Sequence, residues 1–172
     1  GLPDLGMTSL ENVLEDVRRI TAVTEVPLLV DIDTGWDDMG LTVREMIAAG
    51  AAAVHLEDQI AQKRCGHRPN KQIVSCDEMV DRIKAAMDTK TDADFFVIAR
   101  TDAFAQEGLE KAIERARAYV DAGADGIFAE AVQTLDDYRS FAQALEVPIL
   151  ANMTEFGRTP LYMACRSGGL PD

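Results

Sequence analysis

Several common signals are missing from this sequence, and each absence excludes a class of protein. No apolar run approaches the roughly 20 residues that a membrane-spanning helix needs, and the first residues lack the basic, apolar and small-residue order of a signal peptide. Lysine and arginine form no dense run, and the formal net charge of −13 argues against nucleic acid or an anionic membrane as a partner. We therefore expect a cytoplasmic protein that binds neither nucleic acid nor a membrane.

Cysteine is scarce as well, and the usual nucleotide-binding motifs are missing. Cys65, Cys76 and Cys165 form an odd set without CxxC spacing, so we expect neither a disulfide framework nor a zinc site. No GxGxxG or P-loop follows the first expected strand. What is present, 172 residues with 47% hydrophobic and 27% charged content, is typical of one globular domain with a real core.

The hydrophobic pattern alternates between strands and helices. Short apolar runs predict strands at 27–33, 52–57, 95–100, 126–130 and 148–153. Helical spacing predicts helices after a capping box of Thr8 and Glu11, at 41–49, from Ser75 onward, and at 109–122 and 134–146, with Gly50 and Gly123 as stops. Alternation of this kind predicts parallel βαβ units.

We favour an α/β fold of the (β/α)₈ TIM-barrel type over an open sheet, because the nucleotide signatures of open sheets are absent. Five βα units do not close such a barrel. We therefore expect residues 1–172 to form a single barrel domain that is incomplete at both ends and near 36–41.

Polar side chains gather where the predicted strands end, which is where parallel barrels carry their functional groups. They are Asp31, Asp33, Glu57, Asp58, Arg100, Asp102, Glu130 and Asn152. The period of two along a strand predicts that Asp31 and Asp33 point to the same side. Converging carboxylates favour a hard divalent cation such as Mg²⁺, although each acid taken alone fits a helix cap or a solvated surface equally well.

Three further residues have two interpretations each. Arg100 suits a substrate carboxylate or a buried counter-ion for the acids. Cys65 lies between Arg64 and His67 in the polar loop KRCGHRPNK (63–71), and positive neighbours favour a reactive thiol, but residues adjacent in sequence need not be adjacent in space. His55 lies in an apolar strand, so we expect a packed, hydrogen-bonded histidine rather than a ligand.

The motifs together resemble the isocitrate lyase and phosphoenolpyruvate mutase superfamily, from Gly1 to about residue 161. The resemblance rests on KRCGHRPNK, on LVDIDTG (29–35), HLEDQ (55–59), ARTDA (99–103) and ANMTEFG (151–157). Within the superfamily, the loop is most similar to that of the members that act in the methylcitrate cycle of propionate catabolism. The resemblance implies a Mg²⁺-dependent lyase that cleaves a tricarboxylate, 2-methylisocitrate, to pyruvate and succinate, and a homotetramer.

The same resemblance implies a role for individual residues. It assigns metal binding to Asp31 and Asp33, catalysis to Glu57, Arg64, Cys65 and His67, and substrate binding to Asp4, Gly66, Arg100, Glu130, Asn152, Met153 and Thr154. Cys65 would be the acid that protonates the succinate fragment. The superfamily's first strands, which carry a serine-glycine segment and a tyrosine, have no counterpart here, so the general base is not assigned.

Two alternatives remain open at this point. The chain could belong to an isocitrate lyase, or to a related enzyme that decarboxylates or hydrolyses oxaloacetate-type substrates. A different class is an inactive, truncated module that binds a metal ion. The missing strands motivate the second alternative. The sequence WDDMGL at 36–41 is shorter than the corresponding superfamily loop, which instead indicates that a stretch is missing there.

Overall fold

The computed structural model describes residues 7–61, 72–153 and 159–161. Its centre is a five-stranded parallel sheet in which the strands lie in chain order. The strands are β1 (Leu29–Asp31), β2 (Ala53–Glu57), β3 (Phe96–Thr101), β4 (Gly126–Ala129) and β5 (Ile149–Leu150). The helices are α1 (Leu10–Thr21), α2 (Met39–Ala48), α3 (Cys76–Thr89), α4 (Phe104–Glu107), α5 (Leu109–Asp121) and α6 (Leu135–Ala144).

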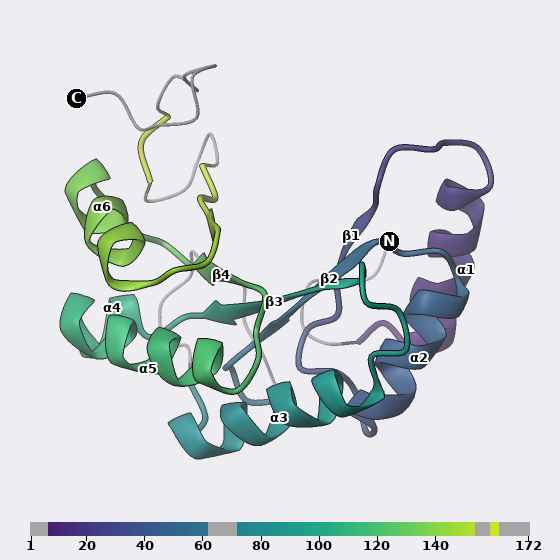
Figure 1. Cartoon of the computed structure of the whole chain (residues 1–172), viewed down its shortest axis with the longest axis horizontal. Coiled ribbons are helices and arrows are strands. Elements are labelled where there is room, and N and C mark those ends of the chain that lie inside the picture. The colour runs from purple at the N-terminus through teal and green to yellow at the C-terminus, as the bar shows by residue number, and fades with distance from the viewer. Residues whose placement is uncertain (1–6, 62–71, 154–158, 162–172) are drawn as a thin grey trace.

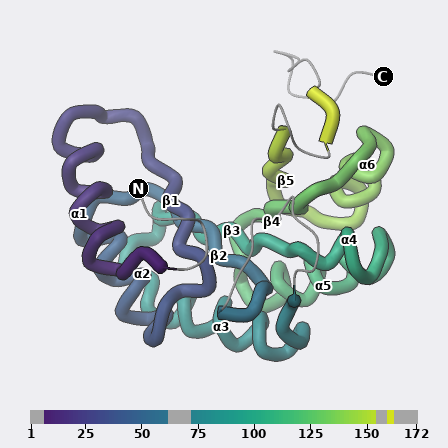
Figure 2. Tube along the Cα trace, turned by 180° about the vertical axis from the view of Figure 1, so that it is seen from behind, coloured from purple at the N-terminus to yellow at the C-terminus, as the bar shows by residue number. Residues whose placement is uncertain are grey.

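The strands form an arc, and the helices lie along its outer side, as both views of the molecule show (Figures 1 and 2). Helix α5 packs on β3 and β4, and α6 packs on β5. This is part of a barrel wall with its helical coat, so the predicted α/β fold with about five parallel βα units is confirmed. Within the described residues, no helix is both long and apolar enough to cross a membrane.

The helices begin where short polar side chains can accept a backbone hydrogen bond. Ser9, Asp38, Ser75 and Thr134 each accept from the backbone N–H three residues ahead, which satisfies one of the unpaired donors of the first turn. The predicted capping box at Thr8 is therefore wrong by one residue, because Ser9 makes that bond. The predicted helix start at Ser75 is confirmed, and Thr134, which was expected to be the first helical residue, is the N-cap instead.

Two glycines end helices as predicted. Gly50 follows α2 with φ +90°, and Gly123 follows α5 with φ +109°. Only glycine adopts this left-handed conformation without strain, so the chain can turn at once into the next strand. Both β2 and β4 begin three residues after the glycine that precedes them.

The core lies between the sheet and the helices. Val54, Leu56 and Val97 point from the strands toward Met79 and Ile83 of α3, and all five are completely buried. Burying side chains of this size stabilises a fold by about 1.5–3 kcal/mol each before entropy is counted. The helical coat therefore fixes the strands whose ends carry the polar residues.

Two local predictions are corrected by the structure. The first strand was expected at 27–33, but β1 covers only Leu29–Asp31, lies at the edge of the described sheet and leaves Leu29 38% exposed. The short helix α4 was not predicted, because Phe104–Glu107 is too brief for a helical period to show. Residues 36–41 form a turn into α2, whose first turn is capped by Asp38.

Candidate active site

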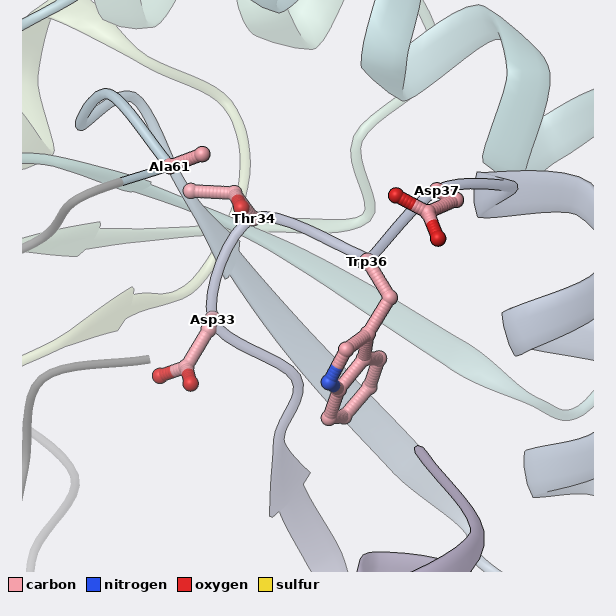
Figure 3. A pocket seen from close by; sticks show the side chains of 5 residues that line it. All are labelled: Asp33, Thr34, Trp36, Asp37 and Ala61. Atoms are coloured by element: carbon pink, nitrogen blue, oxygen red, sulfur yellow. The ribbon is translucent and has the colours of Figure 1, made fainter. Parts of the chain in front are cut away.

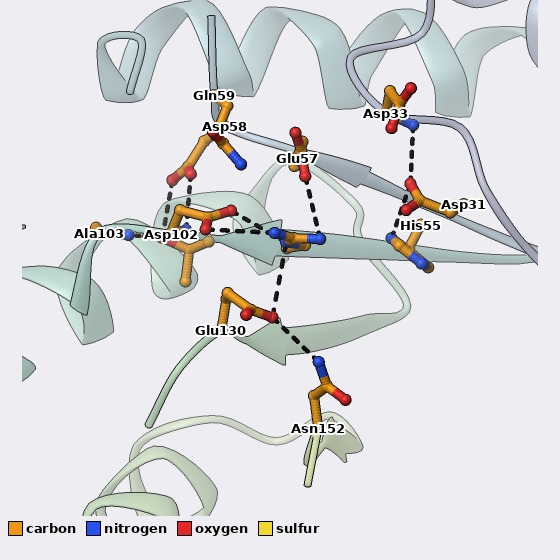
Figure 4. A network of polar contacts seen from close by, with 12 residues as sticks. Asp31, Asp33, His55, Glu57, Asp58, Gln59, Asp102, Ala103, Glu130 and Asn152 are labelled. Carbon is orange, nitrogen blue, oxygen red and sulfur yellow. Dashed lines mark hydrogen bonds and ion pairs between the residues drawn. The ribbon is translucent and has the colours of Figure 1, made fainter. Parts of the chain in front are cut away.

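The strand register brings the predicted site residues to one face of the sheet. Asp31 pairs with His55, and Glu57 pairs with Arg100, which in turn pairs with Phe128. Paired residues in neighbouring strands point to the same face, and so do residues two apart along one strand. The side chains of β1 to β4 therefore form one row on the face opposite the helices (Figure 4).

Arg100 is the centre of this row. Its Nη1 lies 3.1 Å from Glu57 Oε2, and its Nε and Nη2 donate to the two carboxylate oxygens of Asp102 at 3.0 and 3.3 Å. Glu130 Oε2 lies 3.9 Å from Nε, and the guanidinium carbon lies 5.2 Å from the centre of the Phe128 ring. One guanidinium thus meets three carboxylates from the ends of three strands.

The electrostatics of this cluster favour a charged arginine. The Arg100 side chain is only 9% exposed and that of Glu57 only 1%. Burial acts to lower the pKa of Arg100, but the charges of Asp102, Glu57 and Glu130 outweigh it and raise that pKa above its ordinary value. The structure therefore confirms Arg100 as a buried counter-ion, while its contact with substrate stays a prediction.

Asn152 extends the row beyond β5. Its Nδ2 donates to Glu130 Oε2 at 3.5 Å, so the predicted residues Glu130 and Asn152 lie together. Met153 follows directly and is half-buried. The fourth and fifth strand ends thus join the Arg100 cluster from the other side of the arc.

Asp31 and Asp33 occupy the opposite end of the row. The backbone N–H of Asp33 donates to Asp31 Oδ1 at 2.9 Å, and the backbone N–H of Glu57 donates to the Asp33 carbonyl at 2.9 Å. His55 Nδ1 lies 3.6 Å from Asp31 Oδ1, and its ring packs edge-on against Phe128. These bonds place both carboxylates beside Glu57.

The reason for this placement differs from the one that the sequence predicts. Simple alternation assumes an extended strand through Asp33, but β1 ends at Asp31 and Asp33 has φ +51°. The turn, rather than the pleat of a strand, positions Asp33. The Asp31 side chain is 45% exposed, so its oxygens are accessible to a cation.

A small pocket opens beside these acids. Asp33, Thr34, Trp36, Asp37 and Ala61 line it (Figure 3). The Trp36 indole N–H donates to the Thr8 carbonyl at 2.8 Å, which holds the ring beside the residues that precede α1. Trp36 contacts the core as well as lining this pocket.

Several predicted site residues lie outside the described residues: Asp4, Arg64, Cys65, Gly66, His67 and Thr154. The two ends of the segment that holds the Cys65 motif are described, however. Ile60 N–H donates to the Gln72 carbonyl at 3.0 Å, and Val74 N–H donates to the Asp58 carbonyl at 2.8 Å. Residues 58–61 and 72–74, which flank the segment, therefore lie beside each other, at the same end of the sheet as the Arg100 cluster.

Asp102 and His55 belong to the row, although the sequence assigned a role at the site to neither: Asp102 was named only among the polar strand ends. A signal for Asp102 was present, because it lies two positions after Arg100 and shares its face. His55 is buried as predicted, but its apolar neighbours in the sequence gave no hint that Asp31 lies beside it.

Comparison with known proteins gives a consistent picture. The sequence model described as phosphoenolpyruvate phosphomutase matches residues 1–167. A 2-methylisocitrate lyase of Shewanella oneidensis is 62% identical over 165 residues, which are 94% of this chain and 56% of that protein. The chain thus spans about half the length of the curated relatives that it matches.

Solved structures share the fold. A crystal structure of 2,3-dimethylmalate lyase superposes with a TM-score of 0.90 at 36% identity, over 95% of this chain and 56% of that one. A crystal structure of phosphonopyruvate hydrolase superposes with a TM-score of 0.74 at 34% identity, over 86% of this chain and 53% of that one. By sequence and by fold, the chain therefore belongs to the phosphoenolpyruvate mutase and isocitrate lyase superfamily.

Proposed function

We propose that this protein is a Mg²⁺-dependent carbon–carbon lyase that splits 2-methylisocitrate into pyruvate and succinate. The observation that carries the proposal is the 62% identity to a relative named 2-methylisocitrate lyase. The identity to the structurally similar 2,3-dimethylmalate lyase is only 36%. The row of buried and half-buried charges at the strand ends supports an active site on this half of the protein.

The residues of the row fit Mg²⁺. Asp31 and Asp33 offer hard carboxylate oxygens side by side, and Asp31 is accessible. Among the described residues, no group of three or more His, Cys, Asp and Glu side chains is arranged to hold an ion alone. Mg²⁺ suits such a site, since it commonly takes one or two carboxylates and completes its shell with water and substrate oxygens. The related phosphonopyruvate hydrolase was crystallised with oxalate and Mg²⁺.

Each part of the row then has a chemical task. Asp31 and Asp33 would hold the ion, which when bound would supply the positive charge that polarises the hydroxy-acid end of the substrate. Arg100, held in place by Glu57 and Asp102, presents its positive charge to a substrate carboxylate. Asn152 adds a polar contact from the far side of the row. Pyruvate would thus form at one end and succinate at the other.

The bond changes balance without a redox partner. The substrate hydroxyl loses its proton, its oxygen becomes the ketone of pyruvate, and the carbon–carbon bond breaks. The electron pair of that bond stays on the succinate carbon next to a carboxylate, where a positive charge such as that of Arg100 stabilises it. We assign the Cys65 thiol as the acid that protonates this carbon, with Arg64 and His67 adjusting its pKa. General acid catalysis of this kind contributes about 10²–10⁴ in rate.

Substrate comparison tests the proposal. Full-length protein with Mg²⁺ should release pyruvate from 2-methylisocitrate with a higher kcat/KM than it releases glyoxylate from isocitrate. Faster glyoxylate release would favour an isocitrate lyase, and turnover of oxaloacetate alone would favour the hydrolase or decarboxylase alternative. Binding of succinate with Mg²⁺ but turnover of none of the three would favour a binding module.

A further inference from the structure

Asp58 has no task in the chemistry above, yet three hydrogen bonds hold its buried carboxylate. It follows Glu57 and points to the opposite face, toward α5, where it is fully buried. Its Oδ1 accepts from the backbone N–H of Asp102 at 2.8 Å. Its Oδ2 accepts from the hydroxyls of Thr101 at 2.8 Å and Tyr119 at 2.9 Å.

These bonds fix the turn that follows β3. Thr101 donates to Asp58 and accepts from the backbone N–H of Ala103 at 3.2 Å, so residues 101–103 are held from two directions. The side chain of Asp102 leaves this turn toward the other face and pairs with Arg100 through two hydrogen bonds. The position of the Asp102 carboxylate, and with it that of the guanidinium, therefore depends on Asp58.

We propose that Asp58 is a positioning residue, which aims the Arg100 guanidinium at the substrate by fixing the Asp102 turn from behind the sheet. The reaction on which it acts rests on the proposed function, but the chain of contacts does not. The effect passes through Asp102, because no other hydrogen bond of the Asp58 side chain reaches the row directly among the described residues.

The carboxylate form is what this role requires. Three donors converge on Asp58, and a carboxylate accepts from all of them at once. Burial raises the pKa of Asp58, while the bonds from Asp102 and Thr101 oppose that rise. An asparagine keeps the shape but must turn its NH₂ toward either the Asp102 N–H or the two hydroxyls. Either the hydrogen bond from the Asp102 N–H or those from the two hydroxyls are then lost.

Asp125 supplies a matched control. Its Oδ2 also accepts from a β3 backbone N–H, that of Val97, at 2.9 Å, and pairs with Lys90 at 3.1 Å. It lies at the opposite end of the sheet, just before β4 begins. Asp125→Asn therefore removes a similar carboxylate–backbone contact, at the beginning of β3 instead of the turn that follows it, without touching the Asp102 turn.

The test compares kcat and KM of the full-length protein for 2-methylisocitrate with Mg²⁺. Asp58→Asn should lower kcat/KM by about 10-fold to 100-fold, as expected when a catalytic group moves by a fraction of an ångström to an ångström. Asp125→Asn should stay within about twofold of the unchanged protein, at a comparable loss of melting temperature. If the kcat/KM of Asp58→Asn also stays within about twofold of that of the unchanged protein, the proposal is overturned.

A double variant separates positioning from general destabilisation. If Asp58 acts through Asp102, then Asp58→Asn should cause no further loss of kcat/KM once Asp102→Asn is present, because the two share one path to Arg100. Losses that multiply would contradict the proposal. Should the unchanged protein not cleave 2-methylisocitrate, the proposed function fails separately. In that case, calorimetry of oxalate binding in the presence of Mg²⁺ tests the role of Asp58. The proposal then requires that Asp58→Asn binds oxalate more weakly than Asp125→Asn does.

Discussion

Arg100 pairs with three buried carboxylates at once. A lone buried guanidinium costs several kcal/mol of desolvation, and so does each lone buried carboxylate. Placed together, Arg100, Glu57, Asp102 and Glu130 compensate one another, although one arginine cannot neutralise three acids. The cluster keeps an excess of negative charge beside Asp31 and Asp33, which favours a bound cation at that end of the row.

Asp31→Asn tests the metal assignment. The amide oxygen can still accept from the Asp33 N–H, so the local fold should persist while the negative charge is lost. We expect activity to vanish, or the Mg²⁺ concentration for half-maximal activity to rise by about tenfold or more, because hard cations depend on carboxylate charge. Titration of activity with Mg²⁺ measures this, with Asp125→Asn as the control. Unchanged metal activation would move the ion elsewhere.

Cys65→Ser tests the acid. A serine hydroxyl is a far weaker acid than a thiol, so turnover should fall by about 10²-fold or more while product binding stays nearly intact. The matched control is Cys76→Ser, at the first position of α3, where burial raises the pKa of the thiol and no chemistry is assigned. Steady-state kinetics and succinate binding supply the two readouts. Equal activity in both variants would remove Cys65 from the mechanism.

At the scale of elements, the alternation of strands and helices could be predicted because each signal is local. The strand runs, the cap at Ser75 and the glycines at 50 and 123 all depend on residues within one turn or one strand. The clustering of polar strand ends followed from the barrel rule. The Asp33 turn, the Asp31–His55 contact and the task of Asp58 depend on neighbours distant in sequence, and no local pattern encodes them.

Gly123 makes the helix stop testable. Gly123→Ala should destabilise the fold by more than about 1 kcal/mol, since φ is +109° and a new Cβ would lie 3.2 Å from Met87 Cγ. Gly108→Ala is the control, because its φ of +83° carries the backbone strain while nothing lies within 4 Å of its Cβ position. Chemical unfolding should show the larger loss for Gly123. An equal loss would mean that the Met87 contact costs nothing.

The junction of α4 and α5 should respond to acid. Arg115 donates two hydrogen bonds to Glu107. These bonds are the main reason why the pKa of Glu107 lies below its ordinary value of 4.5. Because the pKa of Glu107 is lower in the folded than in the unfolded state, the pair stabilises the fold fully at a pH above 4.5. That stabilisation is lost as the pH falls through the pKa of Glu107 in the folded state.

Glu107→Gln should therefore reduce the melting temperature slightly near neutral pH and not below the folded pKa of Glu107. The effect should be small, about 1 kcal/mol or less, because the carboxylate is partly exposed. Melting curves across this pH range give the difference, with Glu110→Gln in α5, the helix that carries Arg115, as the control. A difference that is independent of pH would show that the ion pair is not its cause.

At the scale of the whole molecule, the chain is an arc of barrel wall whose inner face carries the charges and whose outer face carries the helices (Figure 1). Strands β1 and β5 form the two edges of the described sheet. The chain covers 56% of the 2-methylisocitrate lyase of Shewanella oneidensis. The general base stays unassigned, and the homotetramer stays a prediction.

The most direct measurement is a crystal structure of the full-length protein with Mg²⁺ and oxalate. The account predicts the ion at the end of β1, roughly 2.1 Å from an oxygen of Asp31 or Asp33 or bound to one through a single water, with oxalate on the side of Arg100. An ion away from both aspartates, or oxalate bound away from the ends of β1 to β5, would contradict it.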